Sequence, residues 1–247
     1  MKSIIHKLPS SVTNQIAAGE VIQRPSSIIK ELLENSIDAD SNNIKVIVYE
    51  GGKNKIVVID DGIGMNQEDA VKCFDKHSTS KLKKSSDLFK IKTMGFRGEA
   101  LSSIASVCQI EMKTKMKDLE TGTKVIIEGS KIKDISEVSK RNGTSITIKN
   151  IFYNIPARRN FLKSDAVELR HIIDEFQRIA LANCDVNFSL FNNDIEIHNL
   201  KQSNLSNRII SIFGNNYREQ LIQCNEEFDK IELKGFIGKP KNSKKTR

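Results

Sequence analysis

Hydrophobic and polar positions follow two different spacings along this chain. In the first 40 residues, apolar residues recur every three to four positions, which predicts helices over residues 11–23 and 25–39. The spacing then becomes two over residues 44–60, where Gly51 and Gly52 separate two apolar runs. This second pattern predicts a β-hairpin.

The same two spacings predict the later elements. We expect further helices over residues 66–76, 98–107, 165–183 and 205–213, and strands over residues 107–114, 123–129, 144–149, 185–191, 194–198 and 227–237. Strands in hairpin order with helices between them favour an α+β fold, here a two-layer α/β sandwich whose mixed sheet carries its helices on one face. A doubly wound fold would need strict alternation of strands and helices, which the pattern does not show.

A polar stretch, Asn199 to Asn204, resembles a linker. We therefore expect a first domain over residues 1–203 and the beginning of a second α/β lobe over residues 204–247. The chain ends in a basic tail that begins at Lys239.

Composition narrows the class of protein. Of the 247 residues, 38% are hydrophobic, which is enough for a packed core and argues against general disorder. No apolar run approaches the roughly 18 residues that would span a membrane, and the first residues lack the features of a secretory signal. The four cysteines lie far apart, which argues against a zinc site or disulfides and favours a reducing, cytosolic compartment. The net charge of +8 is compatible with a polyanionic partner or with a solvated lysine-rich surface.

Three polar residues share one arc of the helix predicted over residues 25–39. Glu31, Asn35 and Asp38 are spaced by four and three, opposite the apolar residues. This arc is compatible with an ordinary solvated face. Periodicity alone favours the solvated face, and the alternative is an amide oxygen that binds Mg²⁺ beside a carboxylate that accepts a proton from water.

Two glycine-containing turns lie at strand ends. Asp60 ends an apolar strand and is followed by Gly62 and Gly64, while Thr144 follows Asn142-Gly143 just before another strand. Either sequence is compatible with an ordinary turn. A functional reading is also available, because glycines allow close approach of a flat ligand and an aspartate accepts a hydrogen bond from an exocyclic amine.

The long irregular segment 77–98 is basic and rich in glycine. Six lysines and a single acid lie between Lys76 and Lys92, and Gly95 to Leu101 place an arginine between glycines at a helix start, where N–H groups suit phosphate. The segment is compatible with a flexible loop or with a mobile lid over a polyphosphate. No Walker A sequence occurs.

The order of these features resembles that of the Bergerat-fold ATPases, the superfamily of gyrase, heat-shock chaperones, histidine kinases and MutL. Several stretches of sequence in and between these features are similar to those of the MutL family of DNA mismatch repair proteins. The stretches that carry this resemblance are Asn14 to Val21, Arg24-Pro25, Lys30 to Ala39, Gly95 to Leu101 and Phe152 to Leu162. The resemblance extends from about residue 8 to at least residue 200.

The resemblance implies a role for each matching residue. Glu31 is implied as the general base, Asn35 as the Mg²⁺ ligand, and Asp60 as the reader of the adenine amino group. The other nucleotide-binding residues that it implies are Gly62, Gly64, Thr79, Ser80, Lys81, Arg97, Gly98, Glu99, Ala100, Leu101 and Thr144. Asp61 stands where many relatives carry Asn, and Asp40 where many carry Gly.

The resemblance also implies a function. We expect ATP and Mg²⁺ as cofactors, slow hydrolysis, and an ATP-ordered lid that gates formation of a homodimer. DNA and a mismatch sensor of MutS type are the expected partners, and no membrane is involved; the expected location is the cytoplasm, in association with the nucleoid. In the family, the second lobe carries a lysine that reaches the γ-phosphate. We expect this lobe to be incomplete here, so the alternative is a nucleotide-gated binding fragment with little turnover.

Overall fold

A single eight-stranded sheet organises most of the chain. The structure, a computed structural model, describes residues 6–82, 84–229 and 231–240. The strands of this sheet are β1 (Asn43–Tyr49), β2 (Lys55–Asp60), β3 (Gln109–Lys115), β4 (Gly122–Glu128), β5 (Lys131–Val138), β6 (Gly143–Lys149), β7 (Asn187–Asn192) and β8 (Ile195–Leu200). Their spatial order is β5-β4-β3-β6-β2-β1-β7-β8, and only β1 and β7 among these neighbours pair in parallel.

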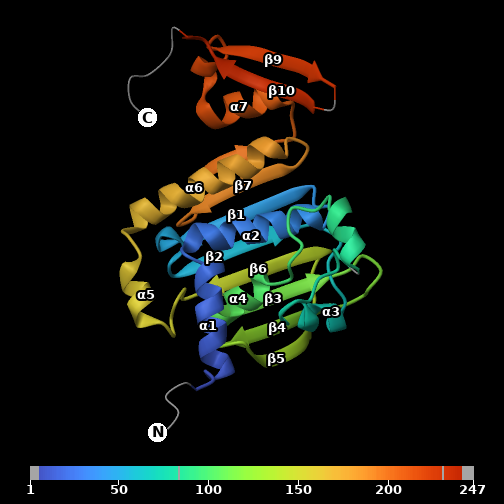
Figure 1. Cartoon of the computed structure of the whole chain (residues 1–247), viewed down its shortest axis with the longest axis vertical. Coiled ribbons are helices and arrows are strands. Elements are labelled where there is room, and N and C mark those ends of the chain that lie inside the picture. The colour runs from blue at the N-terminus through green and yellow to red at the C-terminus, as the bar shows by residue number, and fades with distance from the viewer. Residues whose placement is uncertain (1–5, 83, 230, 241–247) are drawn as a thin grey trace.

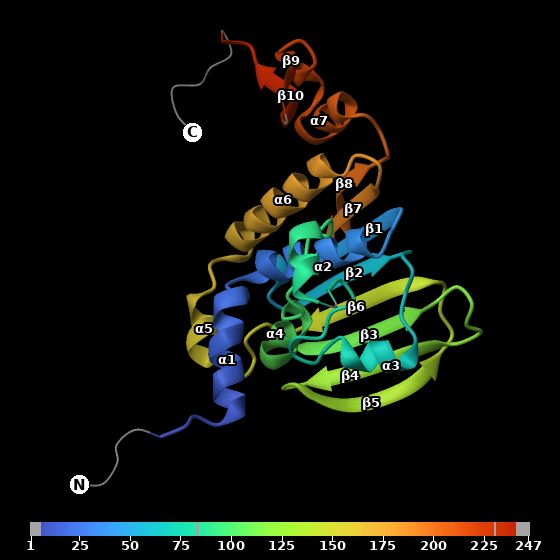
Figure 2. The same ribbon diagram turned by 45° about the vertical axis from the view of Figure 1, so that its right-hand side comes forward.

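Helices cover one face of this sheet, as Figures 1 and 2 show. They are α1 (Ser10–Val21), α2 (Pro25–Asp38), α3 (Gln67–Lys72), α4 (Ala100–Val107), α5 (Pro156–Phe161) and α6 (Asp165–Ala182), with short 3₁₀ turns at Glu50–Gly52 and Ser85–Lys90. The predicted α+β class, with a mixed sheet and helices on one face, is therefore confirmed.

The core lies between the two layers because both follow their hydrophobic spacing. Ile28, Ile29, Leu32 and Leu33 of α2 are buried against alternate residues of the central strands, such as Val46 and Val58. Pro25 occupies the first turn of α2, as predicted. The C-terminal part of α2 lies near the end of β2, where the Ser36 hydroxyl donates to Asp60.

The last part of the chain lies beyond the sheet. α7 (Leu205–Phe213), a 3₁₀ turn (Asn215–Tyr217) and the hairpin of β9 (Leu221–Phe228) and β10 (Ile231–Gly238) follow β8. Figures 1 and 2 show the hairpin on the far side of α6 and α7 from the large sheet. The domain boundary at residues 203 and 204 stays a prediction, and residues 241–247 of the basic tail lie outside the described part of the chain.

Some predicted elements differ from those observed. In place of the single strand predicted over residues 227–237, the structure has a hairpin of two strands. The first strand was not predicted because polar residues interrupt its apolar pattern. β5 and α5 were not predicted: every residue of β5 except Val138 is exposed, and α5 has no buried residue, so neither has a periodic apolar face. The helix predicted over residues 66–76 already ends at Lys72.

Candidate nucleotide site

Asp60 lies at the end of β2 and is almost completely buried, with 9% of its surface exposed. Its Oδ1 accepts the backbone N–H groups of Gly62 and Thr144, each at 3.0 Å, and its Oδ2 accepts the Ser36 hydroxyl at 3.1 Å. Burial raises the pKa of Asp60, and these donors oppose the rise. A carboxylate has about four acceptor sites, so one remains for a further donor such as an exocyclic amine.

Thr144 lies beside Asp60 at the start of β6. Its hydroxyl is 3.0 Å from that of Thr114, which also accepts the N–H of Met65 at 2.9 Å. Gly64 has a φ of 68°, and a Cβ there would lie 2.1 Å from the Lys115 carbonyl oxygen. Only glycine fits this close approach. The structure thus brings Asp60, Gly62, Gly64 and Thr144 together, and their role in nucleotide binding stays a prediction.

The two departures from the family pattern have structural roles outside this pocket. Asp61 turns to the loop after α2 and accepts the N–H groups of Asn42 and Asn43, each at 2.8 Å. Although partial burial favours the neutral form, these donors and the Asn43 side chain hold the pKa of Asp61 below its usual value. Asp40 follows α2 with a φ of 58°, a conformation in which glycine is the least strained residue.

The polar arc of α2 is only partly exposed to solvent. Glu31 and Asn35 lie one turn apart on the arc and are half-buried. The Lys30 ammonium lies 3.3 Å from Glu31 Oε1 and also pairs with Glu34. Asn35 and Asp38 of this arc contact the lid segment 77–98, which sequence periodicity does not reveal.

Contacts between α2 and the lid centre on Asp38. The Lys81 ammonium lies 2.6 Å from Asp38 Oδ2 and donates to Asn35 Oδ1 at 3.1 Å. The N–H groups of Met94 and Gly95 donate to the same carboxylate at 2.9 and 3.1 Å. Both limbs of the lid therefore meet one aspartate of α2.

The other predicted lid residues lie around the base of the lid. The Thr79 hydroxyl accepts the Lys81 N–H at 3.1 Å, whereas Ser80 and Arg97 are exposed. The His77 N–H donates to the Gly98 carbonyl at 3.0 Å and closes the base, and His77 pairs with Glu99 at 3.3 Å. Ala100 and Leu101 begin α4. Among the described residues, Arg97 and Ser80 form no hydrogen bond or ion pair with α2, so the structure does not bring them to Asn35.

Residues that sequence reasoning did not assign to the site also support it. Asp38, Ser36 and Thr114 hold the lid or the Asp60 pocket through the contacts above. Lys140 lies close enough to Asp60 for the carboxylate to oppose the lowering of the lysine pKa by burial, and its ammonium donates to the Gly143 carbonyl. The sequence could have assigned Asp38 to the site, since it lies three residues after Asn35 on the same polar arc of the helix.

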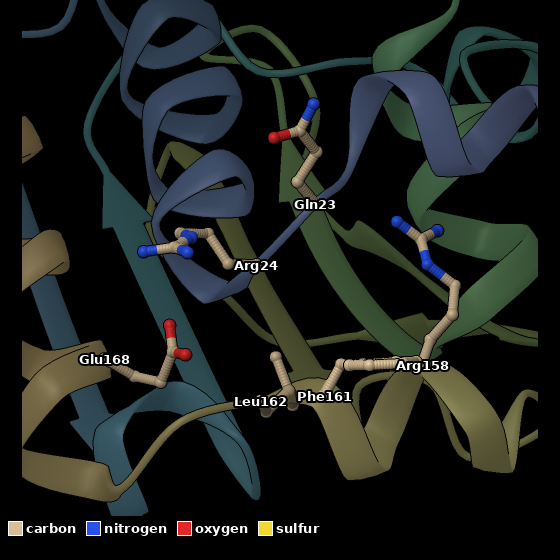
Figure 3. Close-up of a pocket in the computed structure, with 6 residues that line it drawn as sticks. All are labelled: Gln23, Arg24, Arg158, Phe161, Leu162 and Glu168. Atoms are coloured by element: carbon tan, nitrogen blue, oxygen red, sulfur yellow. The ribbon is translucent and has the colours of Figure 1, made fainter.

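A separate hollow lies between α5 and the junction of α1 with α2. Figure 3 shows the residues that line it: Gln23, Arg24, Arg158, Phe161, Leu162 and Glu168. Arg158 also donates to the carbonyl groups of Gly19 and Ile22, each at 3.0 Å, and so joins two of the stretches that carry the family resemblance. None of the lining residues belongs to the predicted ATP site.

The described residues contain neither a cluster of metal ligands nor a membrane-spanning helix. Over residues 6–82, 84–229 and 231–240, no group of three or more His, Cys, Asp or Glu side chains is arranged to hold a metal ion. Within the same ranges, no helix has the length and apolar content needed to cross a membrane.

Comparison with known proteins agrees with this geometry. Residues 23–155 match the family model of histidine kinase-, DNA gyrase B-, and HSP90-like ATPases. The chain is 55% identical to the DNA mismatch repair protein MutL of Flavobacterium psychrophilum and 52% identical to that of Bacteroides fragilis, and the matches cover 100% and 99% of the chain. It spans about 40% of the length of these curated relatives.

Solved structures give the same answer. The Aquifex aeolicus MutL ATPase domain complexed with ADP has a TM-score of 0.64 and 30% identity, covering 78% of this chain and 70% of that one. The N-terminal domain of a DNA repair protein has a TM-score of 0.77 and 25% identity, covering 94% and 74%. The chain therefore belongs to the histidine kinase-, DNA gyrase B- and HSP90-like ATPase family, in which it corresponds to the ATPase region of MutL proteins.

Proposed function

We propose that this chain binds ATP with Mg²⁺ between α2 and the lid and hydrolyses it slowly, as the ATPase region of a MutL-type mismatch repair protein. The observation that carries the proposal is the buried Asp60 carboxylate, which has one acceptor site left after Gly62, Thr144 and Ser36 have donated. The adenine amino group supplies the missing donor. The ADP complex of the Aquifex aeolicus relative supports the same choice of ligand.

The donor set at Asn35 fits a hard cation. Asn35 Oδ1 and Asp38 Oδ2 are hard oxygen donors, and they already hold a cationic group, the Lys81 ammonium. Oxygen ligands of this kind suit Mg²⁺, which keeps several waters and takes its remaining ligands from phosphate. Asn35 and Asp38 would hold Mg²⁺ there, and the ion would supply positive charge against the phosphates.

The chain's own residues supply the remaining chemistry. Asp60 and Thr144 orient the adenine, and Asn35 Oδ1 is the protein ligand for the Mg²⁺ that accompanies the phosphates. Glu31, one turn before Asn35, accepts the proton of the attacking water. Lys81 and the Arg97–Leu101 segment, where α4 begins with free N–H groups, contact the phosphates.

The biological role that we propose follows the relatives' names. Ordering of the lid by ATP gates formation of a homodimer and the engagement of DNA and of a mismatch sensor of MutS type, in a cytoplasmic, nucleoid-associated protein. Disorder-to-order transitions of this kind are a common way to couple a nucleotide to assembly.

Substitution of Glu31 tests the enzymatic part. We expect Glu31→Ala to lower the ATP turnover rate at least about 100-fold, in line with the usual contribution of a general base, while the Kd for ATP changes little. Steady-state phosphate release and equilibrium binding of a fluorescent ATP analogue measure the two quantities. Glu137→Ala, an exposed carboxylate of β5, is the matched control and should leave both unchanged.

Equal turnover in the wild type and Glu31→Ala, with ATP bound by both, would show that the chain is a nucleotide-gated binding module. Absence of ATP binding in the wild type would overturn the proposed function as a whole.

A further inference from the structure

The positively charged Lys81 side chain occupies the position beside Asn35, the proposed metal ligand. Its ammonium contacts Asn35 Oδ1 at 3.1 Å and Asp38 Oδ2 at 2.6 Å. The Lys81 side chain is 18% exposed and that of Asp38 only 5%, so this ion pair is screened little by solvent. A divalent cation bound to the same amide oxygen would meet the ammonium at close range.

Asp38 accepts three hydrogen bonds that fix this arrangement. It lies one turn after Asn35 on α2 and accepts Lys81 from the first limb of the lid and two backbone N–H groups, those of Met94 and Gly95, from the second. A Cβ on Gly95 would lie 3.3 Å from the Lys81 ammonium, so the second limb packs directly on it. The ammonium position is thus built by three segments of the chain.

We propose that Lys81 is the resident counter-ion of Asn35 and Asp38, and that its ammonium and a divalent cation exclude each other at Asn35. Asp38 is the positioning residue that keeps Lys81 there in the absence of nucleotide. The proposal deepens the proposed function, because it rests on Asn35 as the metal-binding residue.

The physical reason is charge balance. The Asp38 carboxylate is neutralised by Lys81, so the Asn35–Asp38 pair offers a bare divalent cation no net negative charge. A cation that arrives with a polyphosphate brings its own negative charge, and the displaced ammonium can then pair with phosphate oxygens. The arrangement couples metal binding to nucleotide binding and leaves Asp38 paired at all times.

Nucleotide-free binding of Mn²⁺, a paramagnetic stand-in for Mg²⁺, tests this exclusion. Loss of the electron paramagnetic resonance signal of free Mn²⁺ measures binding to the whole chain. We expect Lys81→Met, which keeps the length of the side chain and removes its charge, to bind Mn²⁺ at least about tenfold more tightly than the wild type. In Lys81→Met/Asp38→Asn the gain should disappear, because no negative charge remains beside Asn35.

Lys92→Met is the matched control, since Lys92 is an exposed lysine of the same lid. It removes the same charge from the chain and should leave Mn²⁺ binding at the wild-type level. The proposal is wrong if Lys81→Met binds Mn²⁺ no more tightly than Lys92→Met, or if the double variant keeps the gain. Circular dichroism verifies that each variant is folded.

Hydrogen exchange gives a second readout. We expect Asp38→Asn to speed exchange of the Met94 and Gly95 amides about tenfold, since a charge-assisted hydrogen bond is lost at each. Unchanged exchange would overturn the positioning role of Asp38. Neither measurement uses ATP, so failure of this inference is distinct from failure of ATP binding.

Discussion

Two adjacent aspartates, Asp60 and Asp61, have pKa values that move in opposite directions because their surroundings differ. Burial raises the pKa of Asp60, and its partners only partly offset this effect. Asp61 is less buried, and the donors from Asn42 and Asn43 outweigh the effect of burial and lower its pKa. Asp61 therefore stabilises the loop after α2, whereas Asp60 keeps an acceptor site for a ligand.

The raised pKa of Asp60 predicts how ATP binding depends on pH. The ionised carboxylate is the stronger acceptor for the adenine amine, and a raised pKa means that Asp60 becomes protonated at a higher pH than an ordinary aspartate. We expect the Kd for ATP to increase as pH falls through that raised pKa. Isothermal titration calorimetry over a pH series measures the effect.

Asp60→Asn isolates this contribution, because the phosphates of ATP titrate equally in both proteins. The variant should bind ATP about 10- to 100-fold more weakly at neutral pH, as expected for loss of a buried hydrogen bond to a charged group. Its Kd should follow only the titration of ATP itself. An identical pH profile in the variant and the wild type would contradict the role of Asp60.

At the scale of elements, α2 combines packing and chemistry. Its apolar arc is buried against the sheet, and its polar arc carries Glu31 together with Asn35 and Asp38, the two residues that contact the lid. The helix ends where Asp40 takes a positive φ, and the chain then enters β1, which pairs with β2. One helix thus places the lid anchor, the proposed metal-binding residue and the proposed base relative to Asp60.

α7 is attached to the rest of the molecule through Arg208, which is fully buried. Its guanidinium donates to the carbonyl groups of Ala180, Cys184, Val186 and Lys201 at 2.7 to 3.3 Å and lies 5.6 Å from the Phe188 ring centroid. These carbonyls lie around the C-terminal end of α6 and the strands that follow it. Arg208 therefore links the last part of the chain to the eight-stranded domain.

Substitution of Arg208 tests this link. We expect Arg208→Met to lower the free energy of unfolding by about 2–3 kcal/mol, because methionine retains apolar packing but leaves buried carbonyl groups without donors. Urea denaturation followed by circular dichroism measures the change. Arg218→Met, at an exposed arginine in the segment after α7, should change stability little. Equal effects of the two substitutions would argue against a structural role of Arg208.

At the scale of the whole molecule, the order of strands assembles the site. β6 lies between β3 and β2, so Thr144 comes next to Asp60 although 84 positions separate them in the chain. The parallel pair of β1 and β7 joins the first hairpin to the strands after α6. These neighbours bring residues of α2, β2, β6 and the lid into one place.

The charge of the whole chain predicts how DNA binding depends on salt. If lysine and arginine side chains contact DNA phosphates, log Kd should rise linearly with log salt concentration, because counter-ions are released on binding. Fluorescence anisotropy with a labelled duplex, measured with and without ATP at each salt concentration, tests this. An affinity that is independent of salt would rule out phosphate contacts as the source of binding.

Local patterns were sufficient for much of the fold. The apolar spacing of α2, the hairpin of β1 and β2, and the helix α6 were all predictable, because each element buries one regular face. β5 and α5 were not, since their residues are exposed and leave no periodic signal. Asp60, Gly62, Gly64 and Thr144, which the structure joins, stand out in the sequence as turns at strand ends, and only the family resemblance implied a common role for them.

The sequence by itself determined the fold class, the family and the residue types of the site, because these depend on local spacing and on motifs that neighbouring residues carry. Only the tertiary structure decided which of those residues meet. Asp38 looks like one more polar residue of a helix face, and Lys81 lies 43 positions away in an aperiodic segment. Their contact depends on how the lid crosses α2, and long-range packing of this kind has no signature in the spacing of residues along the chain.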